Sequence, residues 1–511
     1  MSVTQLAEIS PQVSASSMYY RRRPAFMHWH STINAEAGRE FLGDSNSLPA
    51  GTSTTGRRAS IASRKKGNAC TTNDKALSPL GSEARAALFP ELRSPPEGPI
   101  LGAPRPLLDT QSATLWNRGK RMNHKLWLLG RFATVGGHVL REKVIRPKAH
   151  KAGDVPVSGE TITPEWLTAV LCRDVPDARV CSFDTTNGSH GTSTRVAIRV
   201  DYNETGRRAA LPTELFAKTT TSLRQRMLLG GAKVIDGETQ FFMNFRPHVE
   251  MEAPQGYWGA VDPASWRSIA LMEDIAATRG AVFTEPNAPV TRDQIEDLVR
   301  NLARLHGTFW EHPSIAALHT PNDMLEAIRS AIDMKGRSAV GLRRAEDVVP
   351  ATLHGQHERL WTGVERALDI ATEDMPRTML HGDPHIGQTY VTHDGRMGFA
   401  DWQVIMQGGW AHDFAYTVNS GCEPDDRRAW DRGLLELYLY ELGRAGGTVP
   451  SFEAAWLAYR QQSMFAYAAW AFTIGRAVYQ PKMQSVETCR TLMRRITTAL
   501  DDLESLDALG V

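Results

Sequence analysis

The segment HGDPHIGQ, residues 381–388, places two histidines, an aspartate and an amide within eight positions. One interpretation is a metal-hydrolase cluster with His381, Asp383 and His385 as ligands, which requires further ligands from other segments. The other is a phosphotransferase catalytic loop, in which Asp383 and Gln388 carry the chemistry. The candidates for the further hydrolase ligands are His393, His412 and Asp413.

The residues after this segment favour the phosphotransferase. Gln388 follows Asp383 by five positions, the spacing between the catalytic aspartate and the metal-binding amide of kinase loops. TYVT, the turn HDGR and MGFAD then predict a hairpin with a D-G turn, and Asp401 lies at its far end. One carboxylate could then hold an attacking hydroxyl, while the amide and the second carboxylate hold Mg²⁺ on the phosphates.

Residues 180–220 predict an antiparallel three-stranded meander. From Val196 to Tyr202 every second residue is apolar, the period of a half-buried strand. The turn NGSHGTST, residues 187–194, joins the first two strands, and its backbone N–H groups could cover nucleotide phosphates. The metal-hydrolase interpretation leaves this β-rich region without a role.

Helical patterns dominate the rest of the chain. In TRDQIEDLVRNLARLHGTFW, Thr291 and Gln294 form a capping box at the start of an apolar stripe. The stripe consists of Ile295, Leu298, Val299, Leu302, Leu305 and Phe309. Further helical patterns cover residues 351–370, 427–443 and 452–507. The sequence therefore predicts a small β-rich lobe followed by a larger helical lobe.

The order and spacing of two charged residues in the first lobe indicate a phosphate-binding pair. Lys218 lies in the third strand of the meander, and Glu238 follows twenty residues later on an expected helix. Each alone is typical of a solvated surface charge. Together they suggest a cation that anchors the α- and β-phosphates and an acid that orients it.

Composition excludes several classes. The 58 Lys and Arg nearly balance the 57 Asp and Glu, so no global field favours nucleic acid. The five cysteines form no CxxC pair, which argues against a disulfide framework or a cysteine zinc site. No apolar run reaches the roughly 18–20 residues of a membrane span. We expect a soluble, cytoplasmic protein without stable membrane insertion.

The N-terminal part differs from the remainder. Residues 1–120 are rich in Ser, Thr, Pro, Gly and Arg without a sustained period, which predicts a disordered segment. Residues 121–160 form a basic amphipathic linker or helix. Its apolar side could rest on an anionic membrane, or it could dock on the following domain, which the adjacent glycines favour. Leu126, Leu129, Phe132 and Ala133 could share one face of that helix.

These motifs, in order, resemble the aminoglycoside phosphotransferase and choline-kinase-like superfamily. Within it the chain is most similar to the ecdysteroid-kinase-like branch and its bacterial relatives. The matching pieces span about residues 180–420: NGSHGTST, LFAK, GETQFF, IALMEDIA, NLARLHGTFW, HGDPHIGQ, FADWQ and WAHDFAYTV. The resemblance implies an α+β, protein-kinase-like fold with an N-lobe at residues 161–275 and a helical C-lobe at 276–511.

The resemblance also implies residue roles. Asp383 would be the catalytic carboxylate, and Asp401 and Gln388 would bind Mg²⁺. His381 and Asp413 would brace the catalytic loop. The residues implied in nucleotide binding are Gly188, Ser189, Gly191, Lys218, Glu238, and the backbones of Glu273 and Ile275 at the hinge.

The expected activity is phosphoryl transfer from ATP, with GTP possible, to a hydroxyl of a small-molecule acceptor. One departure matters, because the family usually has Asn where this chain has Gln388. The alternative is therefore a catalytically weakened, pseudokinase-like nucleotide-binding or scaffold module. The sequence does not identify the acceptor, but we expect a bulky, fairly apolar alcohol over an aminoglycoside.

Overall fold

Alternating apolar residues build an antiparallel sheet in the N-terminal half of the described chain. The computed structural model describes residues 124–186, 188, 191–331, 333–478, 480 and 482–511. The sheet has the order β1-β2-β3-β5-β4. Its strands are β1 Val180–Thr185, β2 Thr194–Tyr202, β3 Glu214–Thr219, β4 Gly256–Asp262 and β5 Arg267–Glu273. The meander predicted for residues 180–220 is confirmed as β1, β2 and β3.

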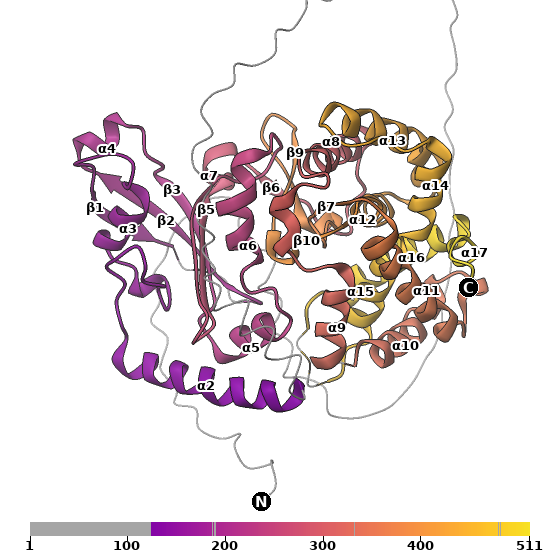
Figure 1. Ribbon diagram of the computed structural model, residues 1–511, viewed down its shortest axis with the longest axis horizontal. Helices are drawn as coiled ribbons and strands as arrows, with labels where there is room; N and C mark the ends of the chain where they lie inside the picture. The colour runs from indigo at the N-terminus through magenta and orange to yellow at the C-terminus, as the bar shows by residue number, and fades with distance from the viewer. Residues whose placement is uncertain (1–123, 187, 189–190, 332, 479, 481) are drawn as a thin grey trace, which may run out of the picture. The chain divides into compact units, whose positions relative to one another are not determined.

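Helices pack around this sheet. Trp166 and Leu167 of α3 are buried against Ile198 of β2 in one apolar cluster. Helix α2 lies alongside α5 at the edge of the lobe (Figure 1). The helices of this lobe are α2 His124–Ile145, α3 Pro164–Leu171, α4 Glu204–Arg208, α5 Leu223–Gly231 and α6 Gly237–Gln240.

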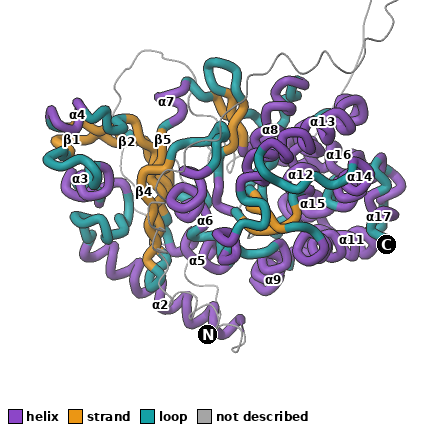
Figure 2. Tube along the Cα trace, turned by 45° about the horizontal axis from the view of Figure 1, so that its top comes forward, coloured by secondary structure: helices purple, strands orange, loops and turns teal. Residues whose placement is uncertain are grey.

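The second lobe is mostly helical (Figure 2). Its α7 is Ile275–Arg279, α8 Arg292–Thr308, α9 Pro321–Ala331, α10 Met334–Arg344, α11 His357–Asp369 and α12 Ala411–Gly421. The remaining helices are α13 Pro424–Arg444, α14 Phe452–Gln461, α15 Met464–Ile474, α16 Val486–Asp502 and α17 Ser505–Ala508. The predicted capping box of Thr291 and Gln294 is present, and the apolar stripe of α8 is buried.

Short strands support the loops of this lobe. Strand β7 Arg377–Leu380 pairs with β10 Met406–Gly409. A three-stranded sheet has the order β6-β8-β9, with β6 Val282–Phe283, β8 Thr389–Val391 and β9 Met397–Phe399. The hairpin predicted after HGDPHIGQ is confirmed as β8 and β9.

The predicted fold class is therefore confirmed: a small antiparallel β lobe precedes a larger helical lobe, as in protein kinases. The predicted boundary near residue 275 remains a prediction, although β5 ends at Glu273 and α7 begins at Ile275. Residues 1–120, predicted to be disordered, lie outside the described residues. In the part of the chain that the structure describes, no helix combines the length and apolarity needed to cross a membrane.

Candidate active site

The loop after β7 is held by a buried carboxylate from α12. Asp413 accepts hydrogen bonds from the backbone N–H groups of His381, at 2.6 Å, and Gly382, at 3.0 Å. His306 of α8 lies 3.3 Å from the same carboxylate and bonds Tyr438 of α13 at 2.7 Å. Burial raises the pKa of Asp413, but the neighbouring histidines more than offset this and lower it. Two helices thus fix the start of the loop.

His381 connects the loop to the end of the β8–β9 hairpin. Its ring is fully buried, with Nε2 3.0 Å from the Ala400 carbonyl oxygen and Nδ1 accepting from the Asp383 N–H at 3.3 Å. Burial lowers the pKa of His381, which favours the neutral ring. Gly382 has φ +84°, and a Cβ there would meet the Val404 carbonyl oxygen at 2.1 Å, so the position requires glycine.

Asp383 has an unusually basic carboxylate. Burial raises its pKa to about 7, against the opposing effects of the Tyr416 hydroxyl, His381 and the Gln388 amide beside it. The Asp401 charge also raises this pKa. A carboxylate whose pKa is near 7 can accept and release a proton at neutral pH, as a general base must.

Gln388 is fixed by its backbone. Its N–H donates to the His385 carbonyl at 2.8 Å, and its own carbonyl accepts from the Ala400 N–H at 2.8 Å. Its side-chain amide lies beside Asp383. The structure therefore brings Asp383, Gln388 and the start of the FADWQ segment together, as the spacing predicted.

Asp401 faces two cations of the N-lobe sheet. Its Oδ1 lies 3.2 Å from Lys218 Nζ, and its Oδ2 lies 3.9 Å from an Arg195 guanidinium nitrogen. Burial raises the pKa of Asp401, but Lys218 and Arg195 outweigh it and lower the pKa to about 2. Lys218 Nζ also lies 2.7 Å from Glu238 Oε1 on α6. Burial raises the pKa of Glu238, and Lys218 opposes that shift.

Arg195 was not among the residues singled out by the sequence, which showed it only as a polar position of an alternating strand. It lies opposite Lys218 in the β2–β3 register, so both side chains leave the same face of the sheet. The signal that could have found it is this pairing. Tyr416, three residues after Asp413 on α12, was also not singled out by the sequence, because its position beside Asp383 depends on how that helix packs.

An aromatic pair connects the two lobes behind these charges. The Phe241 ring, directly after α6, stacks on Trp402 with centroids 3.7 Å apart and planes 4° apart. Trp402 also lies 4.6 Å from the His381 ring. A Cβ at Gly237 would meet the Gln403 carbonyl oxygen at 2.1 Å, so the backbones are in close contact. The helix of Glu238 and the loop of Asp401 are therefore packed as one body.

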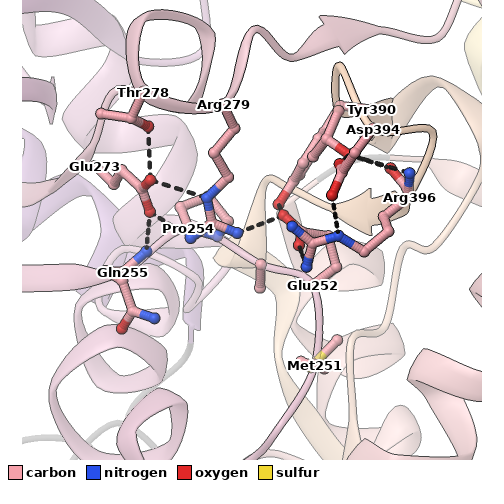
Figure 3. Close-up of polar contacts among 12 residues, drawn as sticks. Met251, Glu252, Pro254, Gln255, Glu273, Thr278, Arg279, Tyr390, Asp394 and Arg396 are labelled. Atoms are coloured by element: carbon pink, nitrogen blue, oxygen red, sulfur yellow. Dashed lines mark hydrogen bonds and ion pairs between the residues drawn. The ribbon is translucent and has the colours of Figure 1, made fainter.

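The hinge between the lobes is held by ion pairs (Figure 3). Glu273 binds Arg279, with Nε 2.8 Å from Oε1, and accepts from the Thr278 hydroxyl at 2.6 Å. Arg279 also pairs with Glu252, which accepts from the Tyr390 hydroxyl at 2.9 Å. The Glu273 side chain thus points into this network, and the predicted contact of its backbone with a nucleotide remains a prediction.

The glycine turn between β1 and β2 is described in part. Gly188 lies so close to β2 that a Cβ would meet the Arg195 carbonyl oxygen at 1.6 Å. The Gly191 carbonyl accepts from the Gln225 side chain at 3.0 Å. Ser189, also predicted to contact nucleotide, lies outside the described residues. The nucleotide-binding roles of these glycines remain predictions.

The metal-hydrolase interpretation finds no support in the ligand geometry. Within the described ranges, no group of three or more His, Cys, Asp or Glu side chains is arranged to hold a metal ion. Both ring nitrogens of His381 have backbone partners, the Asp383 N–H in the loop and the Ala400 carbonyl after the hairpin, and His385 Nδ1 accepts from the Gly387 N–H at 3.1 Å. These imidazoles serve the loop itself.

Comparison with known proteins agrees with this geometry. Residues 223–456 match the model of the phosphotransferase enzyme family. The match contains Glu238, Glu273, Asp383 and Asp401 and begins after Lys218. A search of curated proteins found no match.

Solved structures with detectable likeness include three small-molecule kinases. A microcompartment-associated aminopropanol kinase is 16% identical, covering 66% of this chain and 95% of its own, with a TM-score of 0.39. A choline kinase from Streptococcus pneumoniae is 11% identical, covering 63% and 94%, with a TM-score of 0.35. An ethanolamine kinase from Plasmodium vivax is 11% identical, covering 70% and 92%, with a TM-score of 0.34.

The similarity to the ecdysteroid-kinase-like branch remains a prediction. Through residues 223–456, just under half of its length, the chain is similar to the phosphotransferase enzyme family, and this match supports the predicted resemblance to the aminoglycoside phosphotransferase and choline-kinase-like superfamily.

Proposed function

We propose that this protein transfers the γ-phosphoryl group of ATP to a hydroxyl of a small-molecule acceptor. The observation that carries the proposal is the convergence of Asp383, Gln388 and Asp401 with the Lys218–Glu238 ion pair. The family match supports the reaction class.

Asp383 is the proposed catalytic base. The acceptor hydroxyl oxygen bonds to the γ-phosphorus, the bond to the bridging β,γ-oxygen breaks, and ADP leaves. The hydroxyl proton passes to Asp383, whose pKa of about 7 suits a proton acceptor at neutral pH. Lys218 and Arg195 hold the phosphates and carry part of their charge.

The donor set suits Mg²⁺. Asp401, with a pKa of about 2, is ionised at neutral pH, and the Gln388 side chain, which lies beside Asp383, offers an amide oxygen. Mg²⁺ commonly takes one or two protein oxygens and completes its shell with phosphates and water. When bound, the ion would neutralise charge on the transferred phosphoryl group.

The hinge suits a nucleobase. The Glu273 N–H already donates to the Gln255 carbonyl at 2.9 Å, so we assign nucleobase contact to the Glu273 carbonyl. Ile275 opens α7, where first-turn N–H groups lack intrahelical acceptors. An acceptor followed by a donor matches the amino group and ring nitrogen of adenine, which favours ATP over GTP.

We assign the acceptor to the aromatic side of Asp383, where His385 Nε2 lies 3.8 Å from the Asp383 carboxylate. The His385 ring meets Trp470 edge to face at 5.2 Å and lies 6.1 Å from Tyr416. Burial lowers the pKa of His385 to about 4, so this ring is neutral. The neutral lining supports a fairly apolar alcohol over a polycationic aminoglycoside. Aminoglycoside resistance in cells expressing the protein would count against this assignment.

Nucleotide binding and turnover test the proposal together. Ligand at 100 times its Kd should stabilise the full-length protein by about 2.7 kcal/mol. We expect a Mg²⁺-dependent rise in unfolding temperature with ATP that Asp401→Asn loses. Asp383→Asn should keep that rise but lose turnover on hydroxylated acceptors. Equal loss of binding and turnover in Asp383→Asn would contradict its role, and binding without turnover in the wild type would favour the pseudokinase alternative.

A further inference from the structure

Helix α2 docks on the N-lobe through one face only. Val135 and Val139 are buried there, and Glu142 pairs with the fully buried Arg226. At the same interface Arg131 donates to the Pro263 carbonyl at 2.7 Å and lies over the Trp266 ring at 4.5 Å. Helix α2 therefore packs on the following domain, which was one of the two alternatives for this segment. The contact uses only one side of the helix.

The other side of α2 is apolar and exposed. Leu129, Phe132, Leu140 and Val144 are 66%, 53%, 67% and 84% exposed, and Ile145 is 58% exposed. The first four recur at intervals that keep them on one helical face. This stripe contains the predicted Leu129 and Phe132, but it points away from the lobe. Large apolar side chains gathered on one exposed face mark an interaction site.

The charges around this stripe have one sign. Residues 124–151 contain seven Lys and Arg and one acid, Glu142, which is buried in the docking face. Arg141, Lys143 and Arg146 are exposed beside the stripe, and Lys148 and Lys151 follow it. The remaining residues, 152–511, carry 35 Lys and Arg against 47 Asp and Glu. A basic, apolar surface is thus set on an otherwise acidic body.

We propose that α2 binds the surface of an anionic membrane. The stripe of Leu129, Phe132, Leu140 and Val144, here called the apolar stripe, would enter the boundary between headgroups and acyl chains. The flanking cations would pair with anionic lipid headgroups. This binding is peripheral, and it is independent of the proposed phosphotransfer, because the residues involved lie outside the site.

Charge and apolarity select this partner over others. Residues 1–123 carry 16 Lys and Arg against nine Asp and Glu, so they would be repelled from a cationic helix. A second copy would bring like charges together across the contact. Nucleic acid would match the cations but would leave the apolar stripe in water.

Vesicle partition of the full-length protein tests the proposal. Phosphatidylcholine vesicles with 30 mol% phosphatidylserine would be compared with pure phosphatidylcholine at about 0.1 M salt. We expect partition into the anionic vesicles only, weakened by salt. Arg141→Gln with Lys143→Gln should lower the partition coefficient roughly 25-fold. Phe132→Gln with Leu140→Gln should lower it at least about tenfold.

A matched pair of exposed apolar residues provides the control. Tyr440→Gln with Leu457→Gln changes residues that are 64% and 44% exposed on α13 and α14, and it should leave partition unchanged. Unfolding temperature and ATP binding would verify that each variant is folded. Equal partition into both vesicles, no partition, or partition unaffected by the α2 variants would overturn the proposal. A dimer lost only in the Phe132/Leu140 variant, without lipid binding, would assign the stripe to self-association instead.

Discussion

Arg195 lies directly opposite Lys218 in the antiparallel register of β2 and β3, and both side chains approach the Asp401 carboxylate. The two cations thus share one acid. If Asp401 were to hold Mg²⁺, the Arg195 guanidinium would be free to bind a phosphate oxygen, for which its forked donors suit bidentate contact. Arg195 would then act as an arginine supplied by the chain itself to the transferring group.

Arg195→Gln should lower kcat/KM for MgATP about 10- to 100-fold, the value of a hydrogen bond to a charged group. Arg195→Lys should recover part of this loss, because it keeps the charge but not the fork. Arg199→Gln on the same strand is the control. Its ion pair with Glu214 is exposed, so its effect should stay within about twofold. Equal effects at both positions would reject the assignment.

The pH dependence of the reaction should have an acidic limb set by Asp383. Its pKa of about 7 means that the carboxylate is protonated, and inactive as a base, below neutrality. The value of kcat/KM should therefore rise tenfold per pH unit below about 7 and level off above it. Because the folded pKa exceeds the roughly 3.9 of an unfolded aspartate, the unfolded chain ionises first, so Asp383 lowers the free energy of unfolding as the pH rises from about 4 to about 7, with no further loss above that. Asp383→Asn should consequently unfold at a higher temperature than wild type at pH 8.

Tyr416 tunes this limb. Its hydroxyl opposes the rise in the Asp383 pKa, so Tyr416→Phe should move the limb to higher pH. Tyr459→Phe is the matched control, since that buried hydroxyl bonds Asn419 at 2.7 Å. The pH dependence of kcat/KM is the measurement. A limb that shifts equally in both variants would show a general effect of removing a buried hydroxyl.

We expect the longer Gln388 side chain to place its amide at the correct distance for catalysis, so that asparagine would be too short. Its backbone is bonded on both sides, so Gln388→Asn should withdraw the amide by about one bond length, about 1.5 Å. A displacement of that size should lower turnover on the order of 10²-fold and raise the Mg²⁺ concentration required. The measurement is turnover against Mg²⁺ concentration. Higher activity in Gln388→Asn would instead identify the natural chain as a weakened kinase.

The Phe241–Trp402 stack should couple stability to metal use. Phe241→Leu should cost about 1–2 kcal/mol of unfolding free energy and weaken MgATP binding, because it loosens α6 against the Asp401 loop. Phe245→Leu is the control, since that buried ring packs edge to face against Phe309, with centroids 5.3 Å apart. It should cost similar stability and leave MgATP affinity unchanged. Calorimetric titration with MgATP distinguishes the two.

Local patterns predicted much of this molecule. The alternation in β2, the capping box of α8 and the D-G turn of the β8–β9 hairpin each depend on neighbouring residues. Strand β5 carries no such signal, because nearly all of its residues are buried and the period of two disappears. The same limit applies to Arg195, whose role follows from strand register.

Long-range pairing accounts for the remaining differences. The sequence predicts that α2 is amphipathic. Which face packs on the N-lobe, however, depends on the ion pair between Glu142 and Arg226, which are 84 residues apart. The raised pKa of Asp383 depends on its burial by residues distant in the sequence, and the Tyr416 hydroxyl, which packing of α12 places beside it, limits that rise. The spacing of Asp383, Gln388 and Asp401 was informative because a short loop and hairpin leave few ways to arrange them.

Because Asp413 fixes the catalytic loop by hydrogen bonds, the order in which the ribosome makes the chain matters for activity. A nascent chain that has reached residue 410 already contains every proposed catalytic and nucleotide-binding residue, yet it lacks the carboxylate that fixes the His381 and Gly382 amides. Domains fold as the chain leaves the ribosome. We therefore expect phosphotransfer to begin only after α12 has emerged and packed, and a chain released before that point to be inactive.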